Sequence, residues 1–279
     1  MNQPLVSIIV PTRNSEAVLE ACLESIRAQS YPEIELIVVD RNSTDNTKAI
    51  AETYTTNVYD REPERSAQRN YGAQKAHGTY VFFIDSDMEL DPDVVAACVE
   101  KTAEDPALKG IIVPEESFGK GFWAQCKRLE RSFYIGVDWI EAARFIDRDT
   151  FERIGGYDES LISGEDWDLS QRVAAKGGLG RITELIRHNE GHLHLFRTLR
   201  KKSYYAQQFT KYTDRTDTSA TNQNPYIIVL KRFGLFFSKP HKLFRNPVLG
   251  VGVLFMKVCE FAFGAFGYLA PRKESDGSA

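Results

Sequence analysis

Apolar runs alternate with amphipathic segments in the first part of the chain. The clearest runs are LVSIIV at 5–10, IELIVVD at 34–40 and TYVFFID at 79–85, with shorter ones at 56–60 and 109–114. Between the runs, apolar residues recur at helical spacing, which predicts helices over 15–29, 43–51, 66–76 and 91–104. Continuously apolar strands that alternate with helices are typical of a parallel sheet buried on both faces. The pattern therefore predicts an α/β fold with a mostly parallel sheet flanked by helices.

The pattern changes beyond residue 116. Residues 119–142 are rich in aromatic side chains and are expected to form one long helix, and ARFIDR at 143–148 is expected to be a strand. A short helix is expected over 150–154, ending at Gly155 and Gly156. The acidic cluster GEDWDL at 164–169 then opens a further helix.

The last third of the chain is predicted to be helical. Residues 195–212 and 225–246 combine basic and aromatic side chains, the polar stretch 213–224 is expected to be a loop, and the tail SDGSA is expected to be disordered. The apolar run 248–270 is long enough to cross a bilayer.

Two charges argue against a simple span by this run. Lys257 and Glu260 lie inside it, four glycines interrupt it, and a charge at the centre of a span costs about 2.5–3.5 kcal/mol on insertion scales. We therefore favour an interfacial or re-entrant helix over a span. A buried helix of a soluble protein remains the alternative. The preceding segment with Lys231, Arg232 and Phe233 suits a membrane surface better than a soluble exterior.

Charge divides the chain into two parts. Residues 1–194 hold 21 Lys and Arg against 34 Asp and Glu, a balance of −13, whereas residues 195–246 hold 11 against 2, a balance of +9. Residues 247–279 are balanced, with three of each. An acidic body with a basic C-terminal segment suggests a polyanionic partner or an anionic membrane surface for that segment.

Cysteine usage and the N-terminus point to a reducing compartment. The four cysteines form no C-x-x-C pair and lie in predicted helices, so we expect them to be reduced and mostly buried. The start MNQPLVSIIV has no basic segment and no cleavage site of a secretory signal. We therefore expect a cytoplasmic location.

Polar residues follow directly on three predicted strands. Arg13, Asp40, Asp85 and Asp87 all lie just past strand ends, where parallel sheets bind ligands. Asp85 and Asp87, two positions apart, could share one Mg²⁺ or Mn²⁺, which prefer oxygen ligands. The other interpretation of Asp85-Ser86-Asp87 is an ordinary turn.

A second acidic cluster supports the first. Glu165, Asp166 and Asp168 follow a glycine turn and begin a predicted helix. A carboxylate there that faces the first site could be a general base. The alternative is a set of acids that cap a helix and interact with its dipole, and both roles can coexist in one cluster.

Five motifs occur together in a known order and spacing: PTRN after the first strand, Asp40 after the second, then ERSAQRNYGA, IDSD and GGYDESLISGEDWDL. In these motifs the chain resembles the family 2 glycosyltransferases, which have the GT-A fold, over about residues 4–195. It is most similar to membrane-associated members that build lipid-linked or exported glycans. The resemblance implies a Rossmann-like catalytic domain over 1–194 and leaves 195–279 as a basic, aromatic helical extension at a membrane interface.

The resemblance also assigns the nucleotide site. It implies that Asp40 hydrogen-bonds the base, although Asp40 could instead be a simple turn residue, and that the nucleotide site is lined by Pro11, Thr12, Arg13 and Asn14. Arg65 and Arg69 are one helical turn apart and share a face, so they could contact the nucleotide or its phosphates. Arg65 could instead pair with Glu62 on the surface.

The acids receive their roles from the same resemblance. Asp85 matches the acid that approaches ribose and metal, and Asp87 matches the direct metal ligand. Asp166 matches the general base, and Glu165 is its neighbour. Trp167 either shapes the acceptor site or packs in the core.

A late histidine is the remaining metal ligand that the resemblance implies. The segment RHNEGHLHLF offers three candidates. We prefer His188, because it precedes Glu190-Gly191, and place His192 second. A neutral imidazole is an adequate ligand for Mn²⁺.

The predicted function is that of an inverting, metal-dependent glycosyltransferase at the cytoplasmic face of a membrane. It would use Mn²⁺ or Mg²⁺ and move a hexose, such as mannose or glucose, from a GDP- or UDP-sugar to a lipid-linked or glycan acceptor. A sugar nucleotidyltransferase is one alternative, but PTRNSEAVLEA lacks the glycine-rich loop that such enzymes need. A non-catalytic nucleotide-sugar-binding protein at the membrane is a second. A nucleic-acid binder is a third, and the acidic body argues against it.

Overall fold

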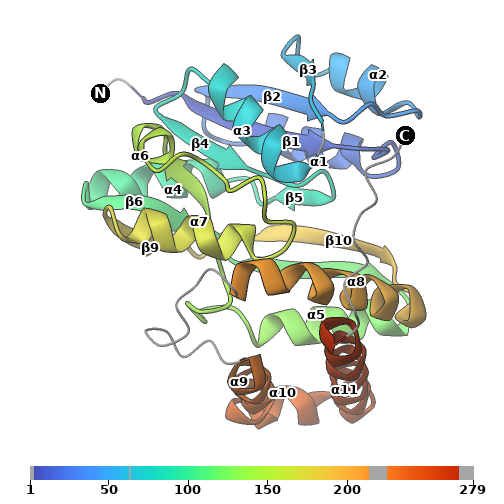
Figure 1. Cartoon of the computed structure of the whole chain (residues 1–279). Helices are drawn as coiled ribbons and strands as arrows, with labels where there is room; N and C mark the ends of the chain where they lie inside the picture. Colours follow the sequence, from blue (N-terminus) through green and yellow to red (C-terminus); the bar gives the residue numbers. More distant parts are fainter. Residues whose placement is uncertain (1–2, 63, 214–224, 270–279) are drawn as a thin grey trace. The chain divides into compact units, whose positions relative to one another are not determined.

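The computed structural model describes residues 3–62, 64–213 and 225–269 (Figure 1). The chain divides into two compact units. The first contains Met1–Gly119, Tyr134–Ser160 and Glu165–Gly191, and the second contains Lys120–Phe133, Leu161–Gly164 and His192–Ala279. The boundary predicted between 194 and 195 stays a prediction. Residues 120–133 belong to the same unit as the C-terminal helices.

A seven-stranded sheet forms the centre of the first unit, in the order β3-β2-β1-β4-β8-β6-β9. Strand β8 is antiparallel to both of its neighbours, and the other pairs are parallel. The predicted α/β class with a mostly parallel sheet is confirmed. The strands are β1 (Val6–Thr12), β2 (Ile34–Asp40), β3 (Val58–Asp60), β4 (Tyr80–Phe83), β6 (Leu108–Ile112), β8 (Ala143–Asp147) and β9 (Gly178–Arg181).

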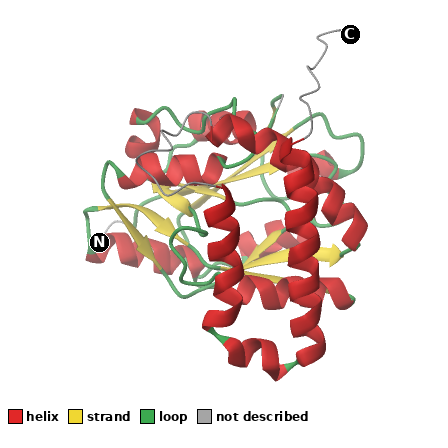
Figure 2. Cartoon of the chain, turned by 60° about the horizontal axis from the view of Figure 1, so that its bottom comes forward, coloured by secondary structure: helices red, strands yellow, loops and turns green. Residues whose placement is uncertain are grey.

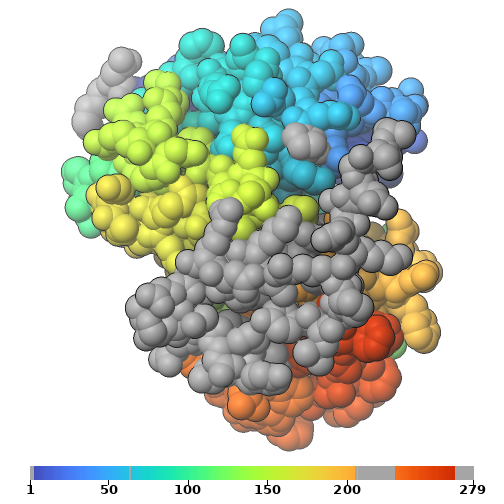
Figure 3. Space-filling view, viewed as in Figure 1, coloured from blue at the N-terminus to red at the C-terminus, as the bar shows by residue number. Residues whose placement is uncertain are grey.

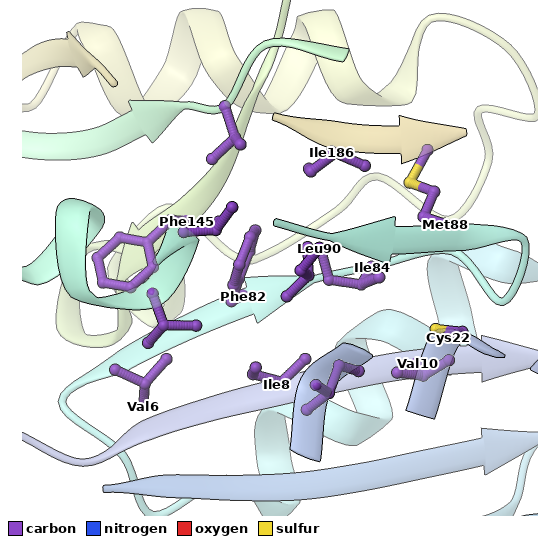
Figure 4. Packing of buried hydrophobic residues seen from close by; sticks show 14 of the residues in the cluster. Val6, Ile8, Val10, Cys22, Phe82, Ile84, Met88, Leu90, Phe145 and Ile186 are labelled. Atoms are coloured by element: carbon purple, nitrogen blue, oxygen red, sulfur yellow. The ribbon is translucent and has the colours of Figure 1, made fainter. Parts of the chain in front are cut away.

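Helices cover both faces of this sheet because successive strand residues point to opposite sides. Ile8 of β1 packs into the cluster that also contains Phe82 and Phe145 (Figure 4). Ile9 packs with Phe83 on the other face. The first face is covered by α1 (Leu19–Arg27), α2 (Thr47–Glu52) and α4 (Val94–Glu104). The second face is covered by α3 (Arg65–Lys75), α6 (Arg148–Arg153) and α7 (Glu165–Ala174).

A small second sheet was not predicted from the sequence. It has the order β5-β10-β7, from Met88–Leu90, Ile186–His192 and Glu115–Lys120. These strands are short or polar, so they lack the apolar runs that marked the main sheet. The hydrogen-bonded pairing of β5 with β10 brings His188 opposite Met88, next to the acids that follow β4.

The long helix expected over 119–142 is wrong. Residues up to Lys120 belong to β7, and the helix α5 covers only Phe122–Ser132. Gly121 has φ 87° and Gly136 has φ 82°, conformations that favour glycine and that an α-helix cannot contain. The helical spacing of the aromatic residues continues past Gly121 and Gly136, although the backbone leaves the helical conformation at both positions.

The second unit is helical, as predicted. It contains α5, α8 (Leu195–Thr213), α9 (Pro225–Ser238), α10 (Pro240–Arg245) and α11 (Pro247–Leu269). Figure 2 shows α9 and α11 side by side, joined by the short α10. The loop predicted within 213–224 and the disordered tail at 275–279 lie outside the described residues, apart from Thr213, which ends α8.

All four cysteines are unpaired, as expected from the sequence. Cys22, Cys98 and Cys126 are buried, and Cys259 is half-buried. Burial raises the pKa of the Cys126 thiol to about 11, with a smaller contribution from Glu130. Burial also raises the pKa of the Cys22 and Cys98 thiols, so the three buried thiols are protonated at neutral pH and serve as small apolar side chains.

Candidate active site

The carboxyl ends of β1, β2 and β4 meet at one edge of the main sheet. Thr12 pairs with Asp40 in the parallel register of β1 and β2, and Ile9 of β1 pairs with Phe83 at the end of β4. Asp85 lies two residues beyond Phe83. Because parallel strands end at the same edge, residues distant in sequence gather there.

Asp40 is fully buried and well satisfied. Its Oδ1 accepts hydrogen bonds from Thr12 Oγ1 at 2.8 Å and Ser43 Oγ at 2.6 Å, and its Oδ2 accepts one from the Ser43 backbone N–H at 2.7 Å. These bonds fix the turn after β2. Asp40 Oδ2 keeps one further lone pair that can accept a hydrogen bond. Contact between Asp40 and a nucleotide base stays a prediction.

The PTRN segment takes several different environments. Pro11 and Thr12 are buried in β1, whereas the side chains of Arg13 and Asn14 are exposed. Asn14 has φ 47°, an uncommon value for a residue other than glycine. Its backbone N–H donates to Ser43 Oγ at 2.8 Å, and its Oδ1 accepts from the Thr44 backbone N–H at 2.9 Å. The loops after β1 and β2 are thus joined.

Arg69 connects the two acidic clusters. Its guanidinium is fully buried and lies 2.6 Å from Asp85 Oδ1 and 2.9 Å from Asp166 Oδ1. Helix α3 supplies Arg69, the segment after β4 supplies Asp85, and the first turn of α7 supplies Asp166. Within the part of the chain that the structure describes, Asp166 Oδ2 accepts no hydrogen bond. That oxygen remains able to take a proton.

Three guanidinium groups neutralise Asp85. Burial alone would raise the pKa of this carboxyl, but Arg69, Arg65 and Arg144 together outweigh burial and hold the pKa well below its usual range. Arg144 NH1 lies 3.5 Å from Asp85 Oδ2. Asp85 is therefore ionised and already compensated by protein charges.

The network continues to Asp87 through two further side chains. Arg144 of β8 donates to Glu115 Oε1 of β7 at 2.9 Å through Nε and lies 2.8 Å from the same oxygen through NH2. Glu115 Oε2 is 3.7 Å from His188 Nδ1, and His188 Nε2 is 3.4 Å from Asp87 Oδ2. Side chains of opposite charge thus alternate from Asp166 to Glu115 through Arg69, Asp85 and Arg144, and the imidazole of His188 lies between Glu115 and Asp87.

Asp87 and His188 fit a divalent cation that also binds a diphosphate. Asp87 is more exposed than Asp85 and offers a carboxylate beside an imidazole nitrogen. Within the described ranges, no group of three or more His, Cys, Asp or Glu side chains is assembled for a metal ion. Two protein ligands are sufficient where phosphate oxygens and water supply the others, which is common for Mg²⁺. The metal roles of Asp85, Asp87 and His188 stay predictions.

A family model described as Glycosyl transferase family 2 matches residues 7–155, just over half of the chain. The chain belongs to this family. A PGL/p-HBAD biosynthesis glycosyltransferase of Mycobacterium tuberculosis is 31% identical over 191 residues, which cover 64% of this chain and 73% of the relative. A GalNAc(5)-diNAcBac-PP-undecaprenol beta-1,3-glucosyltransferase of Campylobacter jejuni is 32% identical over 111 residues, 36% of this chain and 35% of the relative.

Solved structures support the fold of this family 2 glycosyltransferase. A mannosyltransferase from Pyrobaculum calidifontis, in complex with GDP-Man and Mn²⁺, has a TM-score of 0.65 at 19% identity, over 96% of this chain and 88% of that one. S. aureus TarS in complex with UDP-GlcNAc has a TM-score of 0.55 at 16% identity, over 95% of this chain and 89% of that one. These likenesses show the GT-A fold. Family membership makes the protein a glycosyltransferase that uses nucleotide sugars.

Glu165, the neighbour of Asp166 in the glycosyltransferase, pairs with Arg65. The Arg65 guanidinium lies 2.6 Å from Glu165 Oε1, so the alternative pairing of Arg65 with Glu62 is not the one observed. Burial and the nearby Asp166 raise the pKa of the Glu165 carboxyl. Both arginines of α3 therefore contact the acids of α7.

Trp167 and His192 occupy positions unlike those of the central residues. The indole N–H of Trp167 donates to the Ile140 carbonyl at 2.8 Å and fixes this half-buried side chain. His192 ends β10 and belongs to the second unit, where its ring lies 4.8 Å from that of His194. A metal role for His192 stays a prediction.

Sequence reasoning did not find Glu115 or Arg144. Both belong to this glycosyltransferase network, yet Glu115 lies in a polar strand that the apolar pattern did not mark. Arg144 was visible as a charge inside the predicted strand ARFIDR. A charged residue that is buried in a central strand needs a partner, and that signal pointed to a site.

Proposed function

We propose that this chain is an inverting, metal-dependent glycosyltransferase that moves a hexose from a GDP- or UDP-sugar to a lipid-linked or glycan acceptor. Mannose and glucose are the favoured hexoses. The observation that carries the proposal is the charge network from Asp166 to Asp87. At one end of the network, the Oδ2 of Asp166 accepts no hydrogen bond from the described residues. At the other end, the carboxylate of Asp87 lies beside the imidazole of His188.

The donor is expected to bind at the carboxyl edge of β1, β2 and β4. Asp40 and the PTRN segment would contact the nucleoside, and Asp85 would lie near its ribose. Arg65 and Arg69 are held by Glu165, Asp85 and Asp166. We therefore assign them to ordering the acids, with phosphate contact as a further role of the more exposed Arg65.

Asp87 and His188 would hold the divalent metal. When bound, a metal ion there offsets the negative charge that grows on the departing nucleoside diphosphate. Mn²⁺ or Mg²⁺ suits an oxygen and imidazole ligand set. The Mn²⁺ in the Pyrobaculum calidifontis mannosyltransferase supports this choice.

Asp166 is proposed to be the general base. Its Oδ2 takes the proton of the acceptor hydroxyl as that oxygen attacks the anomeric carbon from the face opposite the leaving group. One displacement inverts the configuration of that carbon. Arg69 holds the other oxygen of Asp166 and so orients the base.

A polyprenyl-linked acceptor at the cytoplasmic face of a membrane is proposed from the relatives and from charge. The Campylobacter jejuni relative has undecaprenol in its name. Residues 195–246 carry a balance of +9, which suits the diphosphate of a lipid-linked sugar. The non-catalytic and nucleotidyltransferase alternatives have no observation that favours them over transfer.

Nucleoside diphosphate release from a panel of UDP-, GDP- and dTDP-sugars tests the reaction. We expect release from one donor with Mn²⁺ or Mg²⁺, and loss of release with EDTA or in Asp87→Ala. Lack of both release and nucleotide binding with every donor would refute the proposal.

Asp166→Asn tests the base. We expect turnover to fall by about 10²- to 10⁴-fold because proton transfer is lost, with donor affinity in calorimetry unchanged. Asp168→Asn is the matched control, since Asp168 lies in the same helix but pairs with Arg172 at 2.5 Å. Intact turnover in Asp166→Asn would remove Asp166 from this role.

A further inference from the structure

The charges inside the apolar helix α11 are buried against a neighbouring helix. Lys257 and Glu260 are only 3% and 4% exposed. Lys257 Nζ lies 2.7 Å from Glu130 Oε1 of α5 and 2.5 Å from Glu260 Oε2, and Lys127 Nζ lies 2.9 Å from Glu130 Oε2. We call these four side chains the ionic cluster. They fix which face of α11 points into the second unit.

Two glycines hold α11 close to its neighbours. A Cβ on Gly252 would lie 2.6 Å from Cys126 Sγ of α5, and one on Gly267 would lie 2.3 Å from the Ser203 carbonyl of α8. Both distances are shorter than packed atoms allow, so the close approach requires glycine here. Two of the four glycines that interrupt the apolar run are therefore packing positions.

The opposite face of α11 is apolar and exposed. Four of its side chains recur every three or four residues, and the fifth follows eight residues, or about two turns, later on the same side, so the five form one stripe along the helix: Val248 (67% exposed), Val251 (68%), Phe255 (54%), Val258 (54%) and Phe266 (76%). Phe244 of α10 and Phe237 of α9 are also exposed, at 75% and 58%. We call the five residues of α11 the apolar stripe. Helices α10 and α11, orange to red in Figure 3, reach the surface of the second unit.

The same unit is strongly positive. Its sequence holds 18 Lys and Arg against 6 Asp and Glu, a balance of +12. Lys239, next to α10, and Arg245, at its end, are exposed beside the exposed Phe244. Exposed apolar side chains among cations match the boundary between acyl chains and anionic headgroups.

We propose that the second unit binds the surface of an anionic bilayer through the apolar stripe, with α11 lying along the interface instead of crossing it. By length and hydropathy Pro247–Gly267 qualifies as a span. A crossing helix would have to take its buried partners on α5 into the hydrocarbon, including Lys127 and Glu130. The ionic cluster therefore keeps α11 at the surface while the stripe faces the lipid.

A second copy of the chain is a poorer occupant of this face. Two units that each carry a balance of +12 repel one another, whereas anionic headgroups attract them. The inference does not depend on the transfer reaction, because lipid binding is measured without donor or acceptor. Failure of one proposal leaves the other standing.

Sedimentation of the full chain with preformed vesicles tests the proposal. We expect binding to vesicles of phosphatidylcholine with phosphatidylglycerol, weaker binding to phosphatidylcholine alone, and complete release by alkaline carbonate. The triple variant Val251→Gln, Val258→Gln and Phe266→Gln should bind about tenfold more weakly, since it removes exposed apolar contacts with lipid. Trp139→Gln, which changes an exposed aromatic residue of the first unit, is the matched control and should bind normally.

Other results would overturn the proposal. Carbonate-resistant membrane association would show a span, and equal binding by the triple variant would show that the stripe does not face lipid. A dimer in solution that the triple variant dissociates, without any vesicle binding by the original chain, would assign the stripe to a second copy. Circular dichroism of the triple variant must match the original, as expected for substitutions at exposed positions.

Discussion

A single buried side chain, Arg69, holds both Asp166, the candidate base, and Asp85. Its two terminal nitrogens bond Asp166 and Asp85, and its guanidinium carbon lies 5.0 Å from the centre of the Tyr157 ring. A buried guanidinium with two carboxylates costs little only while both partners remain. We therefore expect the residues around Arg69 to differ in how much each contributes to the free energy of unfolding.

Tyr157→Phe should leave stability unchanged or raise it by up to about 1 kcal/mol. The Tyr157 hydroxyl is buried, and within the described residues it has no hydrogen-bond partner. Its burial therefore costs desolvation free energy that no hydrogen bond offsets, and removing the hydroxyl removes that cost. Urea unfolding measures the change.

Tyr31→Phe is the matched control. The Tyr31 hydroxyl donates to the Pro4 carbonyl at 2.6 Å, so its loss should cost about 1 kcal/mol. A larger loss in Tyr157→Phe than in Tyr31→Phe would contradict the assignment.

Glu35→Gln should make stability less dependent on acid pH. Burial opposes ionisation of Glu35, but hydrogen bonds from the His77 backbone and Ser7 and the His77 ring outweigh it and lower the pKa. A folded-state pKa below the unfolded value of about 4.3 means that this stabilisation is full above that pH. It is lost as pH falls through the folded pKa.

The difference in unfolding free energy between wild type and Glu35→Gln should be about 1 kcal/mol at neutral pH and shrink in acid. Unfolding in urea at a series of pH values measures it. The exposed Glu104, which among the described residues pairs with Lys101, supplies Glu104→Gln as the control. If the difference in unfolding free energy grows in acid, the pKa of Glu35 is not lowered in the folded state.

At the scale of elements, the small sheet completes the site. Strand β10 presents His188 beside Asp87, and β7 presents Glu115 between His188 and Arg144. A carboxylate on the second ring nitrogen fixes the orientation of a metal-binding histidine. Glu115 Oε2 is 3.7 Å from His188 Nδ1, and we predict that Glu115 positions this metal ligand.

Glu115→Gln should weaken Mn²⁺ binding by about tenfold or more, because His188 and Arg144 lose their carboxylate partner. Electron paramagnetic resonance measures free Mn²⁺ directly. Glu116→Gln is the control, since adjacent strand residues point to opposite faces. Equal Mn²⁺ affinity in the two variants would separate Glu115 from the metal site.

At the scale of the whole molecule, two units with opposite charge have different cores. The first is held by apolar layers on both faces of its sheet, whereas the second includes the ionic cluster between α5 and α11. A buried cluster of paired charges specifies one arrangement of the helices, because any other leaves a charge unpaired.

Lys257→Met should destabilise the full chain by about 3–5 kcal/mol, since the buried carboxylates of Glu130 and Glu260 lose one of the cations that compensate them and keep Lys127. Chemical unfolding followed by circular dichroism measures the loss. Lys239→Met at an exposed position should change stability by no more than about 0.5 kcal/mol. Equal behaviour of the two variants would mean that the cluster contributes nothing.

The sequence by itself determined the main sheet, the flanking helices and the acids at its carboxyl edge. Apolar runs and strand ends are local features, and Asp85, Asp87 and Asp166 could be read from them together with the family motifs. It could not determine the polar strands of the small sheet or the end of the long helix predicted over 119–142. Those depend on pairing partners and on backbone conformation at Gly121 and Gly136.

Only the tertiary structure decided which charges meet. Arg69 is 16 residues from Asp85 and 97 from Asp166, and Lys257 is 127 from Glu130. No spacing in the sequence encodes such pairs, because they form only when separate elements pack and water is excluded between them. The same packing shows which face of α11 is left apolar and exposed, a distinction that hydropathy along the chain does not contain.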